Sequence, residues 1–358
     1  MTRCLHIFSK LDRGGAELRT LEFIKRNSGL AKFDILLLSG EAGALDEEFK
    51  KFGILYYKRL SLRNVFWCFL HLRQENYRIV HSHVLFSSAL FMFLAYIAGV
   101  PKRIAHIRSS NVFQGNWLKV AKDHLLRKAL IVFSTHIICI TRTVAIKCFG
   151  INWIEYRSLI VLHNAYEFIP QPKCLTQEGH FCISHIGRFN IAKNQDFVAS
   201  IFKQILTEKG RFARLYFVGR LDKDIYPRVV SKFIHSQFAA NVTFTNEISN
   251  VGEYIIKSDL IIFPSRWEGL GGVIIEAISH GKPVLTSNLE VFQELAAELK
   301  GIHCLNIEEP VSKWVEKIYE LIGLFKNNTS LSIELQESFL NSSFTIEQHD
   351  KTLKDLYK

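Results

Sequence analysis

The cysteines of this sequence lack any pattern that would cross-link it. There are seven cysteines in 358 residues, an odd number, and no pair has the Cys-x-x-Cys spacing. Most lie in apolar runs such as HIICI and HFCISHIG. Disulfide-stapled domains and cysteine zinc sites both need closely patterned cysteines. The pattern therefore argues against both, and it is typical of reduced cysteines in the core of a cytoplasmic protein.

Long apolar segments are lacking as well. The opening residues, MTRCLHIFSKLDRGG, are too short in apolar length and too charged for a signal peptide. The longest apolar run, residues 84–100, reaches only the short edge of a membrane span and lies between two strand-like segments. We therefore expect it to form a buried helix that connects two strands, and we expect no transmembrane segment.

Two common nucleotide-binding motifs are missing. The sequence contains neither G-x-G-x-x-G nor G-x-x-x-x-G-K-[ST], which excludes a dinucleotide fingerprint and a P-loop. Its net charge of +11 and its pI near 9.2 indicate an acidic partner, such as nucleic acid, anionic lipid or a phosphorylated substrate, or else a generally basic surface. Because no nucleic-acid-binding motif accompanies the basic residues, we expect no nucleic-acid partner.

What the sequence does contain is an alternation of strands and helices in two similar halves. A length of 358 residues favours about two domains, and short helical connections predict parallel, doubly wound sheets with ligands at the carboxyl ends of the strands. We expect strands at residues 4–9, 34–39, 54–57, 79–81, 103–107, 136–140, 159–162, 182–186, 214–218, 242–244, 260–263, 284–286 and 303–305. We expect helices at 15–25, 45–51, 84–98, 117–133, 194–208, 226–238, 249–256, 270–280 and 290–297, and a helical tail from 309 onward that ends in an amphipathic segment at 346–357. The polar stretch 170–179 is the best candidate for a linker.

The most informative stretch runs from residue 259 to 294. It contains a buried strand, a Pro-Ser turn, the segment Glu268-Gly-Leu-Gly-Gly, a helix and a second strand. We expect Glu268 in the loop before the helix and Glu276 about two turns into it. The glycines leave backbone N–H groups bare at the helix N-terminus, where the helix dipole favours an anion. The carboxylates can bind sugar hydroxyls, and the bare amides beside them can bind a phosphate. This combination suits a sugar nucleotide.

Two other loops follow expected strands. Arg13-Gly14-Gly15-Ala16-Glu17 opens the first helix, where glycines allow close approach of a phosphate, although an ordinary turn would also need them. In the second half, Gly187-Arg188-Phe189-Asn190-Ile191-Ala192-Lys193-Asn194 has two cations that can flank one diphosphate, or form a solvated pair near a helix start. His106 also ends a strand, a position that is usually structural for a lone histidine.

Together these motifs resemble those of the retaining glycosyltransferases of the GT-B fold, family 4, also called glycosyl transferases group 1, of the bacterial surface-polysaccharide type. The string Glu268-GLGGVII-Glu276 resembles the Glu-x7-Glu signature of that family, and the resemblance extends over nearly the whole chain. It implies an α/β fold of two Rossmann-like, doubly wound parallel-sheet domains facing across a cleft. We expect an acceptor-side domain at 1–170, a nucleotide-sugar-binding domain at 171–340, and a helix at 341–358 that crosses back to the first domain.

The resemblance also implies an activity and a set of site residues. The enzyme would move a sugar from a nucleotide-diphosphate sugar to a hydroxyl of a lipid-linked saccharide, in polysaccharide, O-antigen or lipopolysaccharide biosynthesis, without a metal. Residues implied in catalysis are Glu268, His106, Arg188 and Lys193. Residues implied in donor binding are Gly14, Gly15, Arg188, Lys193, Glu268, Leu270, Gly271, Gly272 and Glu276. Asn246 and the turn His163-Asn164-Ala165 depart from the family pattern.

Partners and location follow from the same reading. We expect a cytoplasmic protein that contacts the inner face of an anionic membrane through the basic amphipathic helix at 117–128, although a solvated helix face would look the same. Arg108 and Asn111 are further candidates for placing the acceptor. Two sugar-nucleotide alternatives stay open, an epimerase or hydrolase on the same fold and a catalytically silent binding protein.

Two motifs could suggest a metal. His81 and His83 share a strand face, but no cluster of further ligands is evident nearby in the sequence. Asp222-Lys223-Asp224 has the Asp-x-Asp form, yet it precedes a helix, where carboxylates are favoured for another reason. We therefore predict no metal site.

Overall fold

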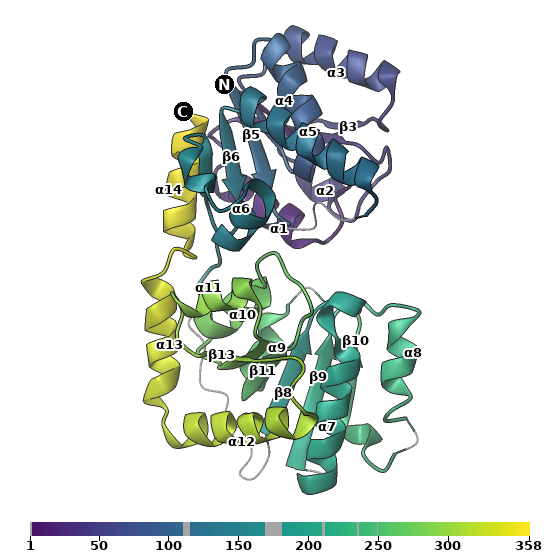
Figure 1. Cartoon of the computed structure of the whole chain (residues 1–358), viewed down its shortest axis with the longest axis vertical. Helices are drawn as coiled ribbons and strands as arrows, with labels where there is room; N and C mark the ends of the chain where they lie inside the picture. The colour runs from purple at the N-terminus through teal and green to yellow at the C-terminus, as the bar shows by residue number, and fades with distance from the viewer. Residues whose placement is uncertain (1, 110–114, 169–180, 210–211, 235, 249) are drawn as a thin grey trace. The chain divides into compact units, whose positions relative to one another are not determined.

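The computed structural model describes the whole chain except residues 1, 110–114, 169–180, 210–211, 235 and 249. The chain forms two compact units, which are described one at a time (Figure 1). The first unit contains Met1–Ala165 and Ile346–Lys358, and the second contains Tyr166–Thr345. The expected linker at 170–179 and the candidate Asn111 lie outside the described residues.

The first unit is built on a seven-stranded parallel sheet. The strand order is β3-β2-β1-β4-β5-β6-β7, and every pairing is parallel. The strands are β1 Arg3–Phe8, β2 Lys32–Leu37, β3 Leu55–Tyr57, β4 Ile79–Ser82, β5 Lys102–Ile107, β6 His136–Cys139 and β7 Leu159–Val161. The helices are α1 Gly15–Arg26, α2 Asp46–Phe49, α3 Leu62–Gln74, α4 Ser88–Ile97, α5 Trp117–Phe133, α6 Arg142–Phe149 and α14 Ile346–Tyr357.

Helix α14 is part of this first unit although it lies far along the chain. Its residues Leu353 and Tyr357 pack into the core formed by β1, β2 and α1. Arg26 donates two hydrogen bonds to Asp350, at 2.9 and 3.0 Å, and Asn27 donates a third at 2.9 Å. Burial alone would raise the pKa of Asp350, but hydrogen bonds from His349, Arg26 and Asn27 hold it below its usual range. The carboxylate therefore stays charged and fastens α14 to α1.

Two helices, α3 and α6, were not expected from the sequence. Helix α3 exposes Leu62 and Phe66, so its apolar residues do not form a single buried stripe. Both helices nevertheless begin at a capping side chain, since Ser61 accepts from the Asn64 amide and Thr141 from the Val144 amide. The cap signals were present, but the periodicity did not reveal the helices.

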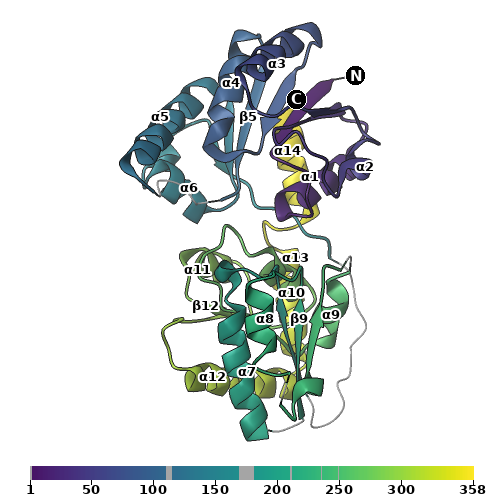
Figure 2. The same cartoon turned by 90° about the vertical axis from the view of Figure 1, so that its right-hand side faces the viewer.

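The second unit has a six-stranded parallel sheet in the order β10-β9-β8-β11-β12-β13. Figure 2 shows this unit from a second direction. The strands are β8 Phe181–Ile186, β9 Ala213–Val218, β10 Val242–Thr245, β11 Leu260–Phe263, β12 Val284–Ser287 and β13 Ile302–Leu305. The helices are α7 Gln195–Lys209, α8 Ile225–Val230, α9 Gly252–Lys257, α10 Gly272–Ser279, α11 Glu290–Ala296, α12 Val311–Asn327 and α13 Ser330–Leu340. Helix α8 is shorter than the expected 226–238. The expected fold class, two doubly wound parallel sheets, is confirmed.

The strand orders locate a ligand-binding edge in each unit. In a doubly wound sheet, ligands bind outside the carboxyl ends of the strands where the strand order reverses. In the second unit that point lies between β8 and β11, and in the first unit it lies between β1 and β4. The longest apolar run of the sequence forms the largely buried α4. Among the helices that the structure describes, none has both the length and the apolar content to cross a bilayer.

Candidate functional site

The loops that follow β8 and β11 lie side by side at the switch point of the second unit. The amide of Arg266 donates to the carbonyl of Ala192 at 2.7 Å, which joins the two loops through their backbones. The buried Asn194 strengthens the link, because its side chain donates to the Pro264 carbonyl at 3.2 Å and accepts from Arg266 at 3.3 Å. The two sequence motifs that carry the expected cations and carboxylates therefore form one site.

Lys193 and Glu268 meet in this site. The Lys193 ammonium donates to Oε1 of Glu268, and the two side chains are only 19% and 14% exposed. The hydroxyl of Ser265 lies 3.4 Å from the same carboxylate oxygen and donates to it. An ion pair shielded to this degree is weakly screened by salt. The site thus holds a cation and a carboxylate in a defined relation to each other.

The position of Lys193 is fixed from three sides. Its amide donates to the Asn190 side chain at 2.9 Å, which caps a short 3-10 turn, Ile191–Lys193. Its ammonium lies 4.4 Å from the centre of the Phe263 ring, a cation–π distance. Its side chain crosses Gly187 so closely that a Cβ there would lie 3.3 Å from the Lys193 Cε. A side chain at position 187 would displace the lysine.

The glycines of the Gly-Leu-Gly-Gly segment have structural reasons to be glycine. Gly271 has a left-handed backbone with φ of +82°, and a Cβ on it would lie 2.8 Å from the Phe292 ring. A Cβ on Gly272 would lie 2.1 Å from the Tyr166 hydroxyl oxygen. Leu270, which precedes the two glycines, is buried. Helix α10 begins at Gly272, and its N-cap residue, Gly271, has no side chain that could bond to the first amides of the helix.

Arg188 and Glu276 also belong to this edge of the second sheet. Arg188 is exposed and, within the described residues, has no side-chain hydrogen bond or ion pair. Glu276 is partly buried in α10, about one turn from the helix start. The expected two turns were wrong, because the helix begins at Gly272 and not at 270. The structure joins Lys193 to Glu268 directly.

Gly14 and Gly15 lie at the switch point of the first unit. Gly14 is the N-cap residue of α1 and makes no side-chain cap bond. A Cβ on Gly14 would lie 2.4 Å from a Glu17 carboxylate oxygen, whereas a Cβ on Gly15 would have nothing within 4 Å. No packing in the described part of the chain therefore requires a glycine at position 15. This open position is where a ligand could approach the backbone.

His106 is buried near the end of β5, in a group of polar side chains. Arg108 donates to its Nδ1 at 3.3 Å, and His81 Nε2 lies 3.3 Å from the same atom. Burial first, and then the charge of Arg108, holds the pKa of His106 well below its usual range. Arg108 also donates to Asn164 at 2.9 Å and to Thr20 at 3.2 Å. His106 is therefore a neutral imidazole.

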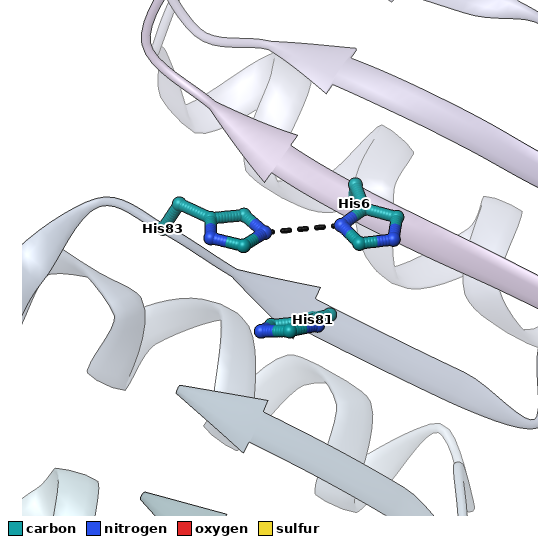
Figure 3. Close-up of side chains that lie close together, drawn as sticks. All are labelled: His6, His81 and His83. Atoms are coloured by element: carbon teal, nitrogen blue, oxygen red, sulfur yellow. Dashed lines mark hydrogen bonds between the residues drawn. The ribbon is translucent and has the colours of Figure 1, made fainter. Parts of the chain in front are cut away.

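The possible metal ligands His81 and His83 have a third histidine beside them, His6, and ligand atoms of the three lie within 4.8 Å of one another (Figure 3). The rings are arranged as hydrogen-bonded stacks, however. His6 Nδ1 lies 3.0 Å from His83 Nε2 with the rings nearly parallel, and the His81 ring stacks on His83 with centroids 4.3 Å apart. A metal lies in the plane of each imidazole that binds it, along the nitrogen lone pair. Here His81 presents largely its face to the two other nitrogens, which does not fit a three-histidine centre.

The Asp222-Lys223-Asp224 motif has a role in local structure. The Asp222 carboxylate accepts from the amides of Asp224 and Ile225, at 2.9 and 3.1 Å, at the start of α8. This is the helix-start role expected from the sequence.

Several residues of both sites were not singled out from the sequence. Ser265 and Asn194 are buried at the edge where β8 and β11 end. In the first unit, the buried His6 and Tyr357 lie beside His81. His6 had a visible signal, since it occupies an apolar strand on the same face as Cys4 and Phe8. Tyr357 had none, because its partners lie hundreds of residues away.

The sequence is similar to those of known glycosyltransferases. Residues 180–323 match the family model described as glycosyl transferases group 1. The chain is 28% identical over 361 residues to the capsular polysaccharide biosynthesis glycosyltransferase CapH of Staphylococcus aureus, covering 100% of this chain and 99% of the relative. It is 26% identical over 72% of both chains to the UDP-Gal:alpha-D-GlcNAc-diphosphoundecaprenol alpha-1,3-galactosyltransferase of Escherichia coli.

Solved structures show the same fold. HepE of Anabaena, crystallised with UDP and glucose, superposes with a TM-score of 0.78 at 15% identity, over 99% of both chains. A glycosyltransferase of Rickettsia africae gives 0.79 at 18% identity, over 100% of this chain and 98% of the other. The architecture is therefore that of the GT-B glycosyltransferases, and the sequence matches support a glycosyltransferase.

Proposed function

We propose that this chain is a retaining glycosyltransferase of family 4 that moves a sugar from a nucleoside-diphosphate sugar to a hydroxyl of a lipid-linked saccharide, in the assembly of a surface polysaccharide such as a capsule or O-antigen. One observation carries the proposal. The shielded Lys193–Glu268 pair lies at the switch point of the second sheet, in the segment that leads into the N-terminus of α10. That point is where a doubly wound sheet binds a nucleotide.

The cations of this edge would stabilise the leaving group. When the bond between the anomeric carbon and the diphosphate oxygen breaks, negative charge grows on that oxygen, and preorganised donors favour the transition state. Lys193 has three N–H donors, so it can bind a phosphate oxygen while it remains bonded to Glu268. The exposed Arg188 can supply a planar pair of donors. The Gly14 and Gly15 amides would approach the same diphosphate.

The carboxylates would position the donor. Glu268, held by Lys193 and Ser265, would accept hydrogen bonds from hydroxyls of the transferred sugar, and Glu276 from the ribose hydroxyls. The acceptor oxygen would bond to the anomeric carbon on the face that the diphosphate leaves. Its proton would pass to the freed phosphate oxygen, and the configuration would be retained. His106 would contact the sugar from the first unit.

We propose that the reaction is independent of metal. Lys193 and Arg188 already supply positive charge, and the Asp222 carboxylate is engaged at a helix start. Activity that persists in excess EDTA would agree with this, and activity that is lost in EDTA and restored by Mg²⁺ or Mn²⁺ would refute it.

The lipid-linked acceptor suggests contact with an anionic membrane, and α5 is the surface that suits it. Leu118, Leu125 and Val132 recur every seven residues on α5 and are 57%, 68% and 70% exposed. Lys122 and Lys128, both exposed, flank them. An apolar stripe bordered by lysines is typical of a helix that lies on an anionic bilayer.

Vesicle sedimentation tests this surface. Leu125→Glu should weaken binding to phosphatidylglycerol vesicles, whereas Ile333→Glu, at a 53% exposed position on α13, should not. Equal binding by the two variants would remove α5 from the proposal.

The function itself is tested with a panel of nucleotide sugars and a membrane lipid extract as acceptor. UDP sugars come first, because HepE was crystallised with UDP-glucose and the Escherichia coli relative is named for UDP-Gal. We expect nucleotide release with one donor, dependent on the extract, lost in Glu276→Ala and kept in Glu253→Gln, a change at an exposed position of α9. Nucleotide release that does not depend on the extract would indicate a hydrolase. The anomeric configuration of the product, read by NMR, tests retention.

A further inference from the structure

A continuous line of hydrogen-bonded rings runs through the interior of the first unit. His6 comes from β1, His81 from β4 and His106 from β5, which are neighbouring strands, so their side chains meet on one face of the sheet. His83 follows β4, and Tyr357 enters from the last turn of α14. Figure 3 shows the three histidines nearest to one another. Except for the partly buried His83, these side chains are at most 5% exposed.

The four histidines of this line are neutral. Burial lowers the pKa of His6 to about 3 and holds the pKa of His81, His83 and His106 well below the usual range, and the charge of Arg108 adds to the effect. A neutral imidazole has one nitrogen that donates and one that accepts. Each contact in the line therefore restricts where the protons lie.

Arg108 determines the first proton position. A guanidinium only donates, so His106 Nδ1, which lies 3.3 Å from Arg108, has to accept. The proton of His106 is then on Nε2. His81 Nε2 lies 3.3 Å from the same Nδ1, and this contact is favourable only if His81 Nε2 also carries a proton.

The remaining positions follow in order. His81 Nδ1 must accept, and Tyr357 donates its hydroxyl proton to it at 2.7 Å. The Tyr357 oxygen then accepts from His6 Nε2–H at 3.3 Å. His6 Nδ1 in turn accepts from His83 Nε2–H at 3.0 Å. The thiol of Cys4 also lies next to the Tyr357 hydroxyl. Burial raises the pKa of this thiol, so it stays neutral. A neutral thiol is only a weak donor or acceptor, so it does not change the order of the protons.

The two ends of the line are the two nitrogens that lack a partner. Of the eight ring nitrogens, only His83 Nδ1 and His106 Nε2 are buried without a hydrogen bond to the described part of the protein. In the order just derived, His83 Nδ1 is a bare acceptor and His106 Nε2–H is a bare donor. The opposite order would satisfy every contact between the rings equally well. Only the contact with Arg108 would be unfavourable, because His106 Nδ1 would then carry a proton and point it at the N–H groups of the guanidinium.

We propose that Arg108 sets the direction of this line and thereby fixes the Nε2–H of His106 as a donor, which bonds an oxygen of the sugar substrate directly or through one water. His81, Tyr357, His6 and His83 are positioning residues in this arrangement. The substrate part rests on the proposed function, which puts His106 in the sugar pocket. The direction of the line does not depend on that function, so the two can be tested separately.

The direction is read from the tautomers of the histidine rings. In protein labelled with ¹⁵N-histidine, the ring nitrogen shifts distinguish Nδ1–H from Nε2–H, and single histidine substitutions assign the signals. We expect each of the four rings to be a single Nε2–H tautomer in the wild type. A mixture, or Nδ1–H at His106, would overturn the inference.

Two variants then test the coupling. Tyr357→Phe interrupts the line at its middle, so His6 and His83 should become tautomer mixtures while His106 keeps Nε2–H. Arg108→Met removes the element that sets the direction, so the change should reach His83 at the far end, and Arg108→Lys should restore the wild-type pattern. A change confined to His106 would reduce Arg108 to a local structural role. Tyr319→Phe, which removes a hydroxyl bonded to Glu208 in the second unit, is the matched control and should alter none of the four rings.

Donor kinetics test the substrate contact. His106→Ala should raise the donor KM or lower kcat at least tenfold. His106→Gln should recover part of the loss, because its amide can present a donor. If the tautomers are as derived but His106→Ala has wild-type kinetics, the line stands and the placement of His106 in the sugar pocket fails.

Discussion

Replacing Lys193 by methionine tests the candidate site most directly. The change keeps most of the side-chain stem over the Phe263 ring and removes the ammonium. In the described part of the chain, Glu268 would then keep only the Ser265 hydroxyl, 3.4 Å away, as a side-chain partner. Because both members of the pair are largely shielded from water, we expect the free energy of unfolding to fall by about 1.5–3 kcal/mol, the usual contribution of a hydrogen bond between charged groups.

The effect on the reaction should be larger than the effect on stability. Removing one preorganised donor from a developing negative charge typically lowers kcat by about 10²–10³-fold. Glu268→Gln preserves shape, and its amide oxygen can still accept from Lys193, so it should cost less stability while still lowering turnover. Denaturant titrations give the free energies, and nucleotide release measured well below the melting temperature gives kcat.

The outcomes separate a catalytic pair from a structural one. If Lys193→Met is destabilised but turns over normally, the pair only joins two loops and the diphosphate assignment fails. If it is as stable as the wild type, the energetic reasoning fails. Lys257→Met is the control, because Lys257 and Glu253 form a pair on α9 that is 45% and 53% exposed, and such exposed pairs contribute little.

Three further predictions follow from positions already described. Gly15→Ala should leave stability unchanged or slightly higher, because nothing lies within 4 Å of the new Cβ. The same change should raise the donor KM about tenfold or more if a phosphate approaches the backbone there. An unchanged KM would refute the proposed contact between Gly15 and the phosphate. Gly272→Ala should destabilise the second unit by about 1–3 kcal/mol, because its Cβ would lie 2.1 Å from the Tyr166 hydroxyl, and adding Tyr166→Phe should recover part of that loss in thermal unfolding. The buried histidines should lower stability in acid, because the pKa of His6 falls from the usual 6.5 to about 3 in the folded protein. The contribution of neutral His6 to the free energy of unfolding is complete above pH 6.5 and is lost at about 1.4 kcal/mol per pH unit as the pH falls below that value. Melting temperatures measured over a pH series for the wild type and His6→Asn would show this loss.

Local signals predicted the elements of the site well. The strand expected at 260–263 coincides with β11, because an apolar run bounded by turn residues is enough to define it. The bounds of α14 were also predicted, since its apolar spacing is regular. Where apolar residues are exposed, as Leu62 and Phe66 are on α3, the same reasoning missed a helix.

Contacts between distant segments could not be read from the sequence in the same way. Lys193 and Glu268 are 75 positions apart, and they meet only because β8 and β11 are neighbours in a sheet whose order is not the chain order. The contact between Tyr357 and His6 spans 351 positions and depends on α14 packing against the first sheet. Periodicity and spacing do not indicate which distant residues pair. Some of the residues in these contacts could be predicted as site residues, but their partners could not.

The attachment of α14 has a consequence for how the chain matures on the ribosome. The segment up to residue 165 is synthesised well before Leu353, Tyr357 and Asp350, whose side chains complete the packing of the first unit. Until then, the buried faces of His6 and His81 lack the hydroxyl that joins them. Domains generally fold in the order in which they emerge. Here the continuous segment 166–345 is synthesised before α14, so we expect the first unit to become native only after the second has emerged.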